Sequence, residues 1–123
     1  MDEVKYIDTY ALVEIADGNP KFVPLLQEKI VVNDITLAEF YFILYREYGL
    51  PTAEYWRKKL DYCTQPVARN VLLQAVRFRY DHKKSNLSFF DCVGYIFAQS
   101  NNVQFVTGDK EFKHLEGVEF IAR

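Results

Sequence analysis

Four acidic residues lie close to the ends of apolar segments in this sequence of 123 residues. Asp8 and Asp109 each follow a short apolar run that is typical of a buried strand. Glu39 and Asp91 each lie in the first turn of an expected helix. Carboxylates that converge at a partly buried place repel one another and are costly to ionise without a cation. Mg²⁺ and Mn²⁺ take such oxygen ligands, and the ions support hydrolysis of phosphate esters.

Each of these acids also has a purely structural explanation. Asp8 and Asp109 are residues of a favoured N-cap type. The segment Thr36–Glu39 matches the S/T-x-x-E capping box, and Ser88–Asp91 is a close relative of it. Capping alone accounts for each acid taken singly, whereas a metal site accounts for all four together. Both interpretations stay open, because a carboxylate can cap a helix with one oxygen and bind a metal with the other.

The elements expected around these acids alternate between short strands and helices. Strands are predicted at residues 4–7, 29–32, 103–106 and 118–121, with a weaker candidate at 61–65. Helices are predicted at residues 9–16, 21–28, 37–48, 52–60, 67–80 and 88–99. This alternation predicts an α/β fold with a parallel sheet and helices on both faces. Right-handed crossovers then bring the carboxyl ends of the strands, and the acids beside them, to one edge of the sheet.

The composition limits the class of protein. Half of the residues are hydrophobic and 16% are aromatic, so residues 1–123 can form one domain with a substantial core. A net charge of −2 excludes a histone-like electrostatic binder but permits a local basic patch. Cys63 and Cys92 stand far apart without a CxxC motif, which indicates reduced thiols and a cytoplasmic location. No apolar run reaches the ~18 residues of a membrane span, and we expect neither a membrane segment nor a signal peptide.

Two groups of basic and aromatic residues are candidates for binding partners. The more basic one combines Tyr80 with five cations: Arg69, Arg77, Arg79, Lys83 and Lys84. These cations are of the type that contacts RNA phosphates, and Tyr80 is of the type that stacks on a base. A solvated helix face is the alternative. The second group comprises seven aromatic residues, suited to a protein partner, a homodimer face or ordinary core: Phe40, Tyr41, Phe42, Tyr45, Tyr48, Tyr55 and Trp56.

Four segments in the same order resemble the motifs of one known family, the PIN domain. They are Tyr6–Leu12, Thr36–Glu39, Leu87–Cys92 and Phe105–Phe112, and together they span nearly the whole sequence. Within that family, the sequence is similar to the toxin-type, VapC-like ribonucleases of toxin–antitoxin pairs. The resemblance implies a three-layer α/β/α sandwich around a mainly parallel sheet of four to five strands.

The same resemblance implies a site and a reaction. It implies that Asp8, Asp91 and Asp109 bind Mg²⁺ or Mn²⁺, and that Glu39 is a further ligand or positions the attacking water. Thr9 and Thr107 match supporting hydroxyls, while Glu111 stands where many members have Asp. The implied activity is metal-dependent endonucleolytic cleavage of RNA.

The resemblance also implies partners, and two alternative functions remain. A toxin of this type would pair with a small antitoxin and form a homodimer. One alternative is another Mg²⁺-dependent phosphoryl-transfer hydrolase, although Tyr10 stands where a haloacid-dehalogenase phosphatase needs a second Asp. The other alternative is a PIN-like module that binds RNA or protein without catalysis.

Overall fold

The computed structural model describes residues 3–123, which form one five-stranded sheet with all strands parallel. The spatial order is β3-β2-β1-β4-β5. The strands are β1 (Lys5–Ile7), β2 (Ile30–Asn33), β3 (Thr64–Gln65), β4 (Gln104–Thr107) and β5 (Val118–Phe120). The predicted α/β class and parallel sheet are therefore confirmed, with five strands.

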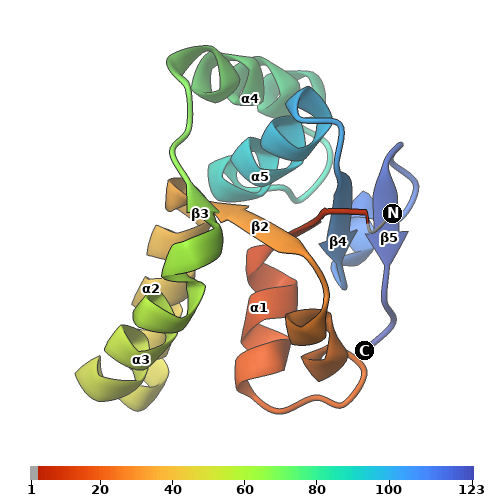
Figure 1. The fold of residues 1–123 in the computed structure, drawn as a ribbon. Coiled ribbons are helices and arrows are strands. Elements are labelled where there is room, and N and C mark those ends of the chain that lie inside the picture. The colour runs from red at the N-terminus through yellow and green to blue at the C-terminus, as the bar shows by residue number, and fades with distance from the viewer. Residues whose placement is uncertain (1–2) are drawn as a thin grey trace.

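Five α-helices and three 3₁₀ helices connect the strands (Figure 1). The α-helices are α1 (Thr9–Ala16), α2 (Asp34–Tyr48), α3 (Leu50–Leu60), α4 (Arg69–Asp81) and α5 (Phe89–Ser100). The 3₁₀ helices are η1 (Val23–Gln27), η2 (Asp61–Cys63) and η3 (Lys110–Phe112).

Two predicted elements differ from the structure. The helix predicted at 21–28 is the 3₁₀ helix η1, in which Pro24 supplies no backbone N–H, so regular α-helical hydrogen bonding is interrupted. The strand candidate at 61–65 is mostly the 3₁₀ helix η2, and only Thr64–Gln65 pair with β2. The side chains of Cys63 and Thr64 both donate to the carbonyl of Leu60, which holds this turn against the end of α3.

The predicted start of α2 is also wrong. The helix begins at Asp34, and its N-cap is Asn33, whose side-chain oxygen accepts a hydrogen bond from the Thr36 N–H at 2.9 Å. Thr36–Glu39 is therefore not a capping box, since Thr36 already lies inside the helix. Glu39 lies in the second turn of α2, not the first, and its side chain takes no part in capping.

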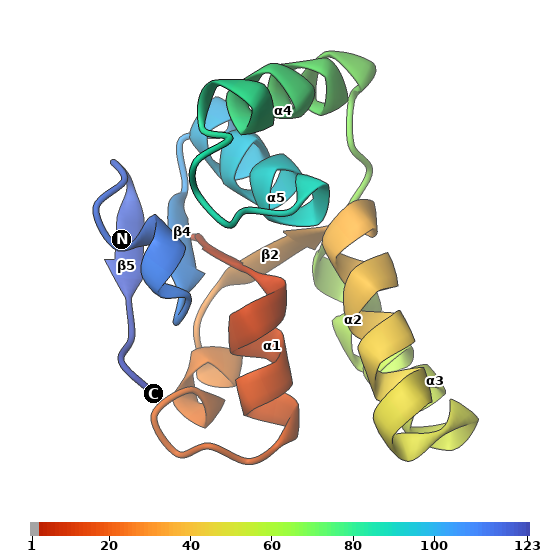
Figure 2. The ribbon, with the colours of Figure 1, turned by 180° about the vertical axis from the view of Figure 1, so that it is seen from behind.

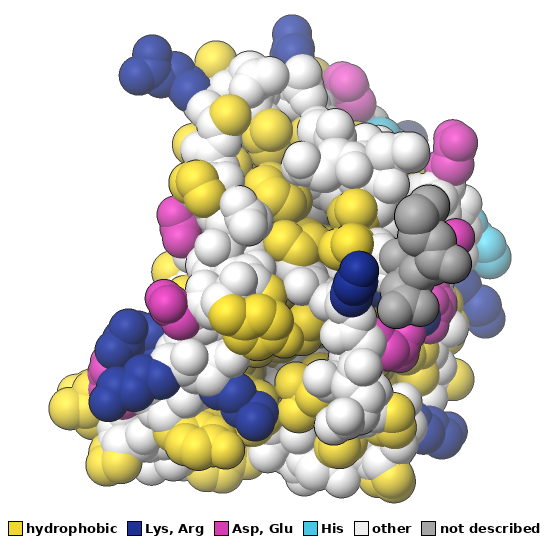
Figure 3. Space-filling view, viewed as in Figure 1, with side chains coloured by type: hydrophobic (Ala, Val, Ile, Leu, Met, Phe, Trp, Pro, Cys, Tyr) yellow, Lys and Arg dark blue, Asp and Glu magenta, His cyan; other side chains and the backbone are white. Residues whose placement is uncertain are grey.

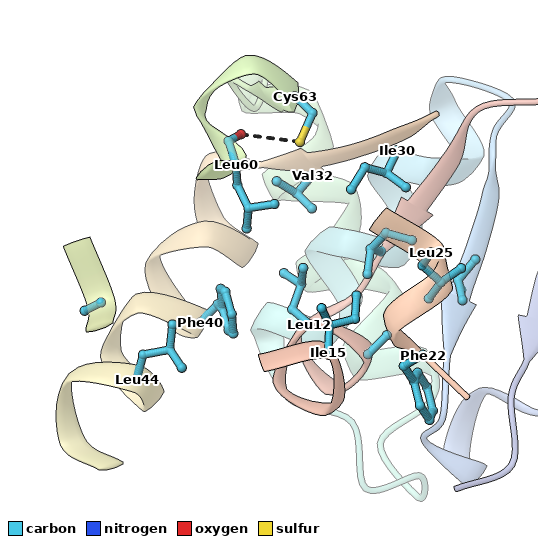
Figure 4. Packing of buried hydrophobic residues seen from close by; sticks show 14 residues of the cluster. Leu12, Ile15, Phe22, Leu25, Ile30, Val32, Phe40, Leu44, Leu60 and Cys63 are labelled. Carbon is cyan, nitrogen blue, oxygen red and sulfur yellow. Dashed lines mark hydrogen bonds between the residues drawn. The ribbon is translucent and has the colours of Figure 1, made fainter. Parts of the chain in front are cut away.

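The helices cover both faces of the sheet, as Figure 1 shows: α4 and α5 lie above it, and α1, α2 and α3 lie below. Alternating strand residues divide between the two cores. Ile7 and Val106 pack on the face covered by α1, α2 and α3, in the core that includes Phe40 of α2 (Figure 4). Tyr6 and Phe105 pack with α4 and α5 on the other face. This is the predicted three-layer α/β/α sandwich.

The register brings the carboxyl ends of the strands to a common edge. Ile7 of the central strand β1 aligns with Val106 of β4, and the N–H of Asp8 donates to the Val106 carbonyl at 3.2 Å. Figure 2 shows the beginning of α1 close to α2 and α5 at the centre of the molecule. The residues that leave the strands at this edge therefore lie among three helices.

Both cysteines are free thiols, as expected. Cys63 belongs to the core that contains α1 and α2, whereas Cys92 belongs to the core on the opposite face of the sheet. The sheet between them prevents a disulfide. Over residues 3–123, the helices include none with the length and apolar character needed to span a membrane.

Candidate active site

Asp8 is the buried centre of the site. It directly follows β1 and caps α1, so its side chain is only 5% exposed. One carboxylate oxygen accepts from the Ala11 N–H at 2.9 Å, and the other accepts from the Thr107 hydroxyl at 2.6 Å. Burial, together with the charges of Asp91 and Asp109, raises the pKa of Asp8 to about 8 despite these hydrogen bonds.

Asp109 leaves the neighbouring strand β4 through a tight turn. Its N–H donates to the Thr107 hydroxyl at 3.0 Å, and its carboxylate accepts from the Glu111 N–H at 3.0 Å. Thr107 therefore connects two acids, since the same hydroxyl donates to Asp8. Between them, Gly108 leaves no room for a side chain, because a Cβ atom there would lie 2.3 Å from Cε1 of Tyr10.

Glu39 reaches the site from α2. The Thr9 hydroxyl, one residue after Asp8, donates to Oε1 of Glu39 at 2.6 Å. Burial raises the pKa of Glu39, and the nearby Asp91 charge contributes to the same direction. The hydrogen bond joins residues 30 positions apart and fixes the Glu39 carboxylate beside α1.

Asp91 is held by the capping box that begins α5. The Ser88 N–H donates to Oδ2 of Asp91 at 2.9 Å, and the Asp91 N–H donates to the Ser88 hydroxyl at 3.1 Å. This confirms the capping interpretation of Ser88–Asp91. Burial raises the pKa of Asp91, and the Asp109 charge acts in the same direction.

The structure brings all four predicted acids together. Glu39, Asp91 and Asp109 line one open cleft of about 320 Å³, and Asp8 lies close enough for Asp91 and Asp109 to affect its pKa. Further lining residues escaped the sequence reasoning: Tyr10, Val13, Glu14, Asp17, Ile43 and Arg123. Tyr10, Val13, Glu14 and Asp17 follow Thr9 at helical spacing, which places them on one face of α1. This part of the cleft could therefore have been predicted from the sequence.

Arg123 is the residue that the sequence gives no reason to expect in the cleft. Its Nε atom lies 2.9 Å from Oε1 of Glu14, a carboxylate of α1 that is itself buried. The side-chain amide of Asn19 also donates to that oxygen, at 3.4 Å. The ion pair joins residues more than a hundred positions apart, so only folding brings them together.

The donor set suits a hydrated hard cation. Each of the three cleft acids uses one carboxylate oxygen in the hydrogen bonds above, and the other oxygen has no such partner within residues 3–123. In that same range, no three acidic, histidine or cysteine side chains are arranged to ligate one ion directly. Mg²⁺ commonly keeps several waters and binds through one or two carboxylates. Burial and the neighbouring acids raise the pKa values of Asp8, Glu39 and Asp91, and a bound cation would favour their ionised forms.

The remaining predicted residues lie outside the acid cleft. Glu111 lies on η3 and is exposed, and its backbone N–H supports Asp109. Arg79 and Lys83 line a second cavity together with Tyr80. Arg69, Arg77 and Lys84 are exposed and line neither cavity. The functional roles of all these residues stay predictions.

Comparisons with known proteins agree with this architecture. The family model of the PIN domain matches residues 5–118. No curated protein matches the sequence significantly. Among solved structures, the fold is similar to that of Mycobacterium tuberculosis VapC20, described as a sarcin-ricin loop cleaving toxin. The TM-score is 0.81 and the identity 18%, and the match covers 97% of this chain and 99% of that one.

Two further solved structures are similar to this chain. One is a toxin–antitoxin complex from Klebsiella pneumoniae, with a TM-score of 0.75, 18% identity and coverage of 94% of this chain and 95% of that one. The other is VapBC2 from Rickettsia felis bound to a DNA fragment from its promoter, with a TM-score of 0.70, 16% identity and 98% coverage of both chains. At these identities the structural likeness establishes the fold, and the family model, which covers nearly all of the sequence, establishes that the chain belongs to the PIN domain family.

Proposed function

We propose that this protein is a metal-dependent endoribonuclease and the toxin of a toxin–antitoxin pair. The observation that carries the proposal is the convergence of Asp8, Glu39, Asp91 and Asp109 at the carboxyl edge of the parallel sheet. Four carboxylates converge here, and burial raises the pKa values of Asp8, Glu39 and Asp91. Such a group is a cost to the fold that a divalent cation offsets. The fold shared with VapC20 supports RNA as the substrate.

The residues divide the work of hydrolysis among them. Asp8, Asp91 and Asp109 would hold Mg²⁺ or Mn²⁺, directly or through intervening waters, and Glu39 would position the attacking water. A divalent cation in such a site lowers the pKa of water and stabilises the negative charge that develops on the phosphate oxygens. Thr9 fixes Glu39 so that its other oxygen can accept a proton from the attacking water. The water would attack the phosphorus in line while the P–O bond to the leaving sugar oxygen breaks, and that oxygen would take a proton from solvent to leave as an alcohol.

Cleavage of RNA by matched variants tests this proposal. Purified protein is incubated with single-stranded and structured RNA in Mg²⁺, Mn²⁺ or EDTA. We expect Asp8→Asn and Asp109→Asn to lower the cleavage rate by roughly a hundredfold. Asp61→Asn, which changes an exposed carboxylate outside the cleft, should cleave like the wild type.

The other outcomes separate the alternatives. Equal cleavage by wild type and the Asp8 or Asp109 variants would refute the role of these acids. Hydrolysis of a small phosphomonoester without cleavage of RNA would identify another phosphoryl-transfer hydrolase. If the protein shows no activity on either substrate and binds no metal, it is a non-catalytic binding module.

The toxin assignment also calls for protein partners. Four aromatic residues of α2 and α3 are more than half exposed, namely Phe42, Tyr45, Tyr48 and Tyr55, whereas Phe40 is buried in the core. Figure 3 shows hydrophobic side chains interspersed with basic ones over these helices. Exposed aromatic residues are enriched at protein interfaces, which supports a small antitoxin and a homodimer as partners of a cytoplasmic protein.

Co-expression with the product of any small reading frame found directly upstream of the gene tests the pairing. We expect the two products to co-purify at a fixed ratio, and the complex to cleave RNA more slowly than the isolated protein. Light scattering of the isolated protein measures the homodimer directly. An adjacent product that neither binds nor inhibits would count against the toxin assignment while leaving the nuclease assignment intact.

A further inference from the structure

A second cavity, of about 340 Å³, lies outside the acid cleft between the end of α4 and the beginning of α5. Its walls combine aromatic and basic side chains, chiefly Arg79, Tyr80, Lys83 and Phe89. Its volume is within the range of small-ligand sites. The acids that characterise the catalytic cleft are absent from its walls among the described residues, so the two cavities differ in charge.

The aromatic walls of this cavity are open to solvent. Tyr80 is 67% exposed, so a ligand can reach its ring from solvent. The Lys83 ammonium lies 4.4 Å from the centroid of that ring. One ligand can therefore contact both the cation and the aromatic ring. Unpaired nucleotides offer the two groups that such walls bind: a flat base that stacks on an aromatic ring and a phosphate that pairs with a cation.

Arg79 is held in position before any ligand binds. Its Nε–H donates to the carbonyl of Leu87 at 3.1 Å, which ties the end of α4 to the segment preceding α5. The terminal nitrogens of the guanidinium group remain to contact a phosphate. A side chain that is already fixed loses little conformational freedom on binding, and a guanidinium fits phosphate oxygens well.

The cavity adjoins the acid cleft through the first turn of α5. Phe89 lines the cavity, Ser88 caps the helix, and Asp91 of the same turn lines the cleft. Residues two positions apart point to widely separated sides of a helix, and a helix with its side chains is about 10–12 Å across. An RNA chain with one phosphodiester in the acid cleft can therefore place a nearby nucleotide in the second cavity.

We propose that this cavity is a subsite for an unpaired nucleotide that flanks the scissile phosphate. Its base stacks against Tyr80 and Phe89, while Arg79 and Lys83 bind its phosphate. The subsite explains how a protein of net charge −2 with an acidic cleft retains a polyanion, because the attraction comes from beside the catalytic acids. It also favours single-stranded or looped RNA, since a paired base is not free to enter. This inference rests on the proposed ribonuclease function.

Binding measurements in an inactive background test the subsite separately from cleavage. The full chain carrying Asp109→Asn is titrated with a fluorescent single-stranded oligoribonucleotide, followed by anisotropy. In that background, Tyr80→Ala should weaken binding roughly tenfold. Lys83→Gln should reduce the slope of log K against log salt by about 0.7, as expected for one lost phosphate contact on a single strand.

An exposed tyrosine and lysine outside both cavities provide matched controls. Tyr62 of η2 is 71% exposed, Lys58 of α3 is exposed, and neither lines the second cavity or the acid cleft. Tyr62→Ala and Lys58→Gln remove the same chemical groups, and they should change RNA affinity by less than about twofold. Thermal unfolding of every variant shows whether a lost affinity reflects a lost fold.

An abasic oligoribonucleotide identifies stacking itself. Removing the base at the flanking position should weaken binding to the parent protein, and Tyr80→Ala should then have no further effect. Unchanged affinity in the Tyr80 and Lys83 variants overturns the subsite, whether or not the wild type cleaves RNA. The subsite is also overturned if the Tyr80 or Lys83 variant keeps its RNA affinity but no longer self-associates or binds a protein partner. The cavity would then be a protein contact. If instead the parent binds RNA through Tyr80 but the wild type cleaves none, the subsite stands and the nuclease assignment fails.

Discussion

At Asp8, burial and two neighbouring carboxylates act on the same acid. Its pKa of about 8 means that the folded protein binds a proton near neutral pH that the unfolded chain, with an ordinary pKa of 3.8, has released. The contribution of Asp8 to stability is therefore complete below about pH 4 and is lost as the pH rises toward 8. A bound cation reverses this trend, since it favours the ionised carboxylate.

Asp8→Asn should remove this dependence. In EDTA, we expect the variant to be more stable than the wild type at pH 8 by up to a few kcal/mol, with the difference shrinking toward pH 4. Asn also accepts a hydrogen bond as an N-cap, so the start of α1 is preserved. Urea unfolding across this pH range measures the difference. Parallel stability curves for the two proteins would contradict the raised pKa.

Gly108 is the other residue whose identity is fixed by its surroundings. In Gly108→Ala, the new methyl group would meet the ring of Tyr10 and would lie 3.1 Å from the carbonyl oxygen of Ile121. We expect a loss of about 1–3 kcal/mol in the free energy of unfolding, together with slower cleavage, because the turn carries Asp109. Denaturant titration measures the first effect and RNA cleavage the second.

The clash with Tyr10 can be isolated by a double-mutant cycle. Tyr10→Ala should cost less stability in the Gly108→Ala protein than in the wild type, since it relieves the overlap. Equal costs in the two backgrounds would show that the backbone contact, not the ring, excludes a side chain at this position.

The helices contribute to the site mainly through the way they begin. Asp8 starts α1, Ser88 and Asp91 start α5, and Asp109 starts η3. In each case the capping hydrogen bond fixes a catalytic candidate to rigid backbone. The positive end of the helix dipole also favours a carboxylate there, which partly offsets the repulsion among the acids.

Ser88→Ala should therefore affect both stability and catalysis. Loss of the cap should cost about 1 kcal/mol of unfolding free energy, and a less constrained Asp91 should lower the cleavage rate. Ser88→Thr keeps the hydroxyl and should retain both properties. Ser100→Ala, an exposed change at the other end of α5, is the matched control. A fall in stability without any change in rate would show that the cap does not position Asp91.

At the scale of the whole molecule, metal binding should increase the free energy of unfolding. An ion that binds only the folded state at 100 times its Kd adds about 2.7 kcal/mol to the free energy of unfolding. We expect Mg²⁺ or Mn²⁺ to raise the melting temperature of the wild type, more at pH 8 than at pH 5 because the carboxylates must be ionised. Asp109→Asn should show little or no shift, and EDTA should reverse it. Equal shifts in the variant would place the ion elsewhere.

The sequence by itself determined the class of fold and the group of acids. The alternation of β-branched strands with helical periodicity predicts a parallel sheet, and a parallel sheet brings the ends of its strands to one edge. Asp8 and Asp109 could be assigned to that edge because Asp8 directly follows β1 and Asp109 follows β4 after a single glycine. Ser88–Asp91 could be assigned as a cap because its signature lies within four residues.

The tertiary structure decided what depends on segments far apart in the chain. It placed the start of α2 at Asp34, with Asn33 as the N-cap, because packing and capping of the whole helix outweigh a local four-residue signature. It also paired Thr107 with Asp8 across 99 positions and Arg123 with Glu14. The walls of the second cavity likewise come from the end of α4 and the segment before α5, which the hydrogen bond from Arg79 to the Leu87 carbonyl joins. Such contacts arise from packing in three dimensions, which no local pattern of residues encodes.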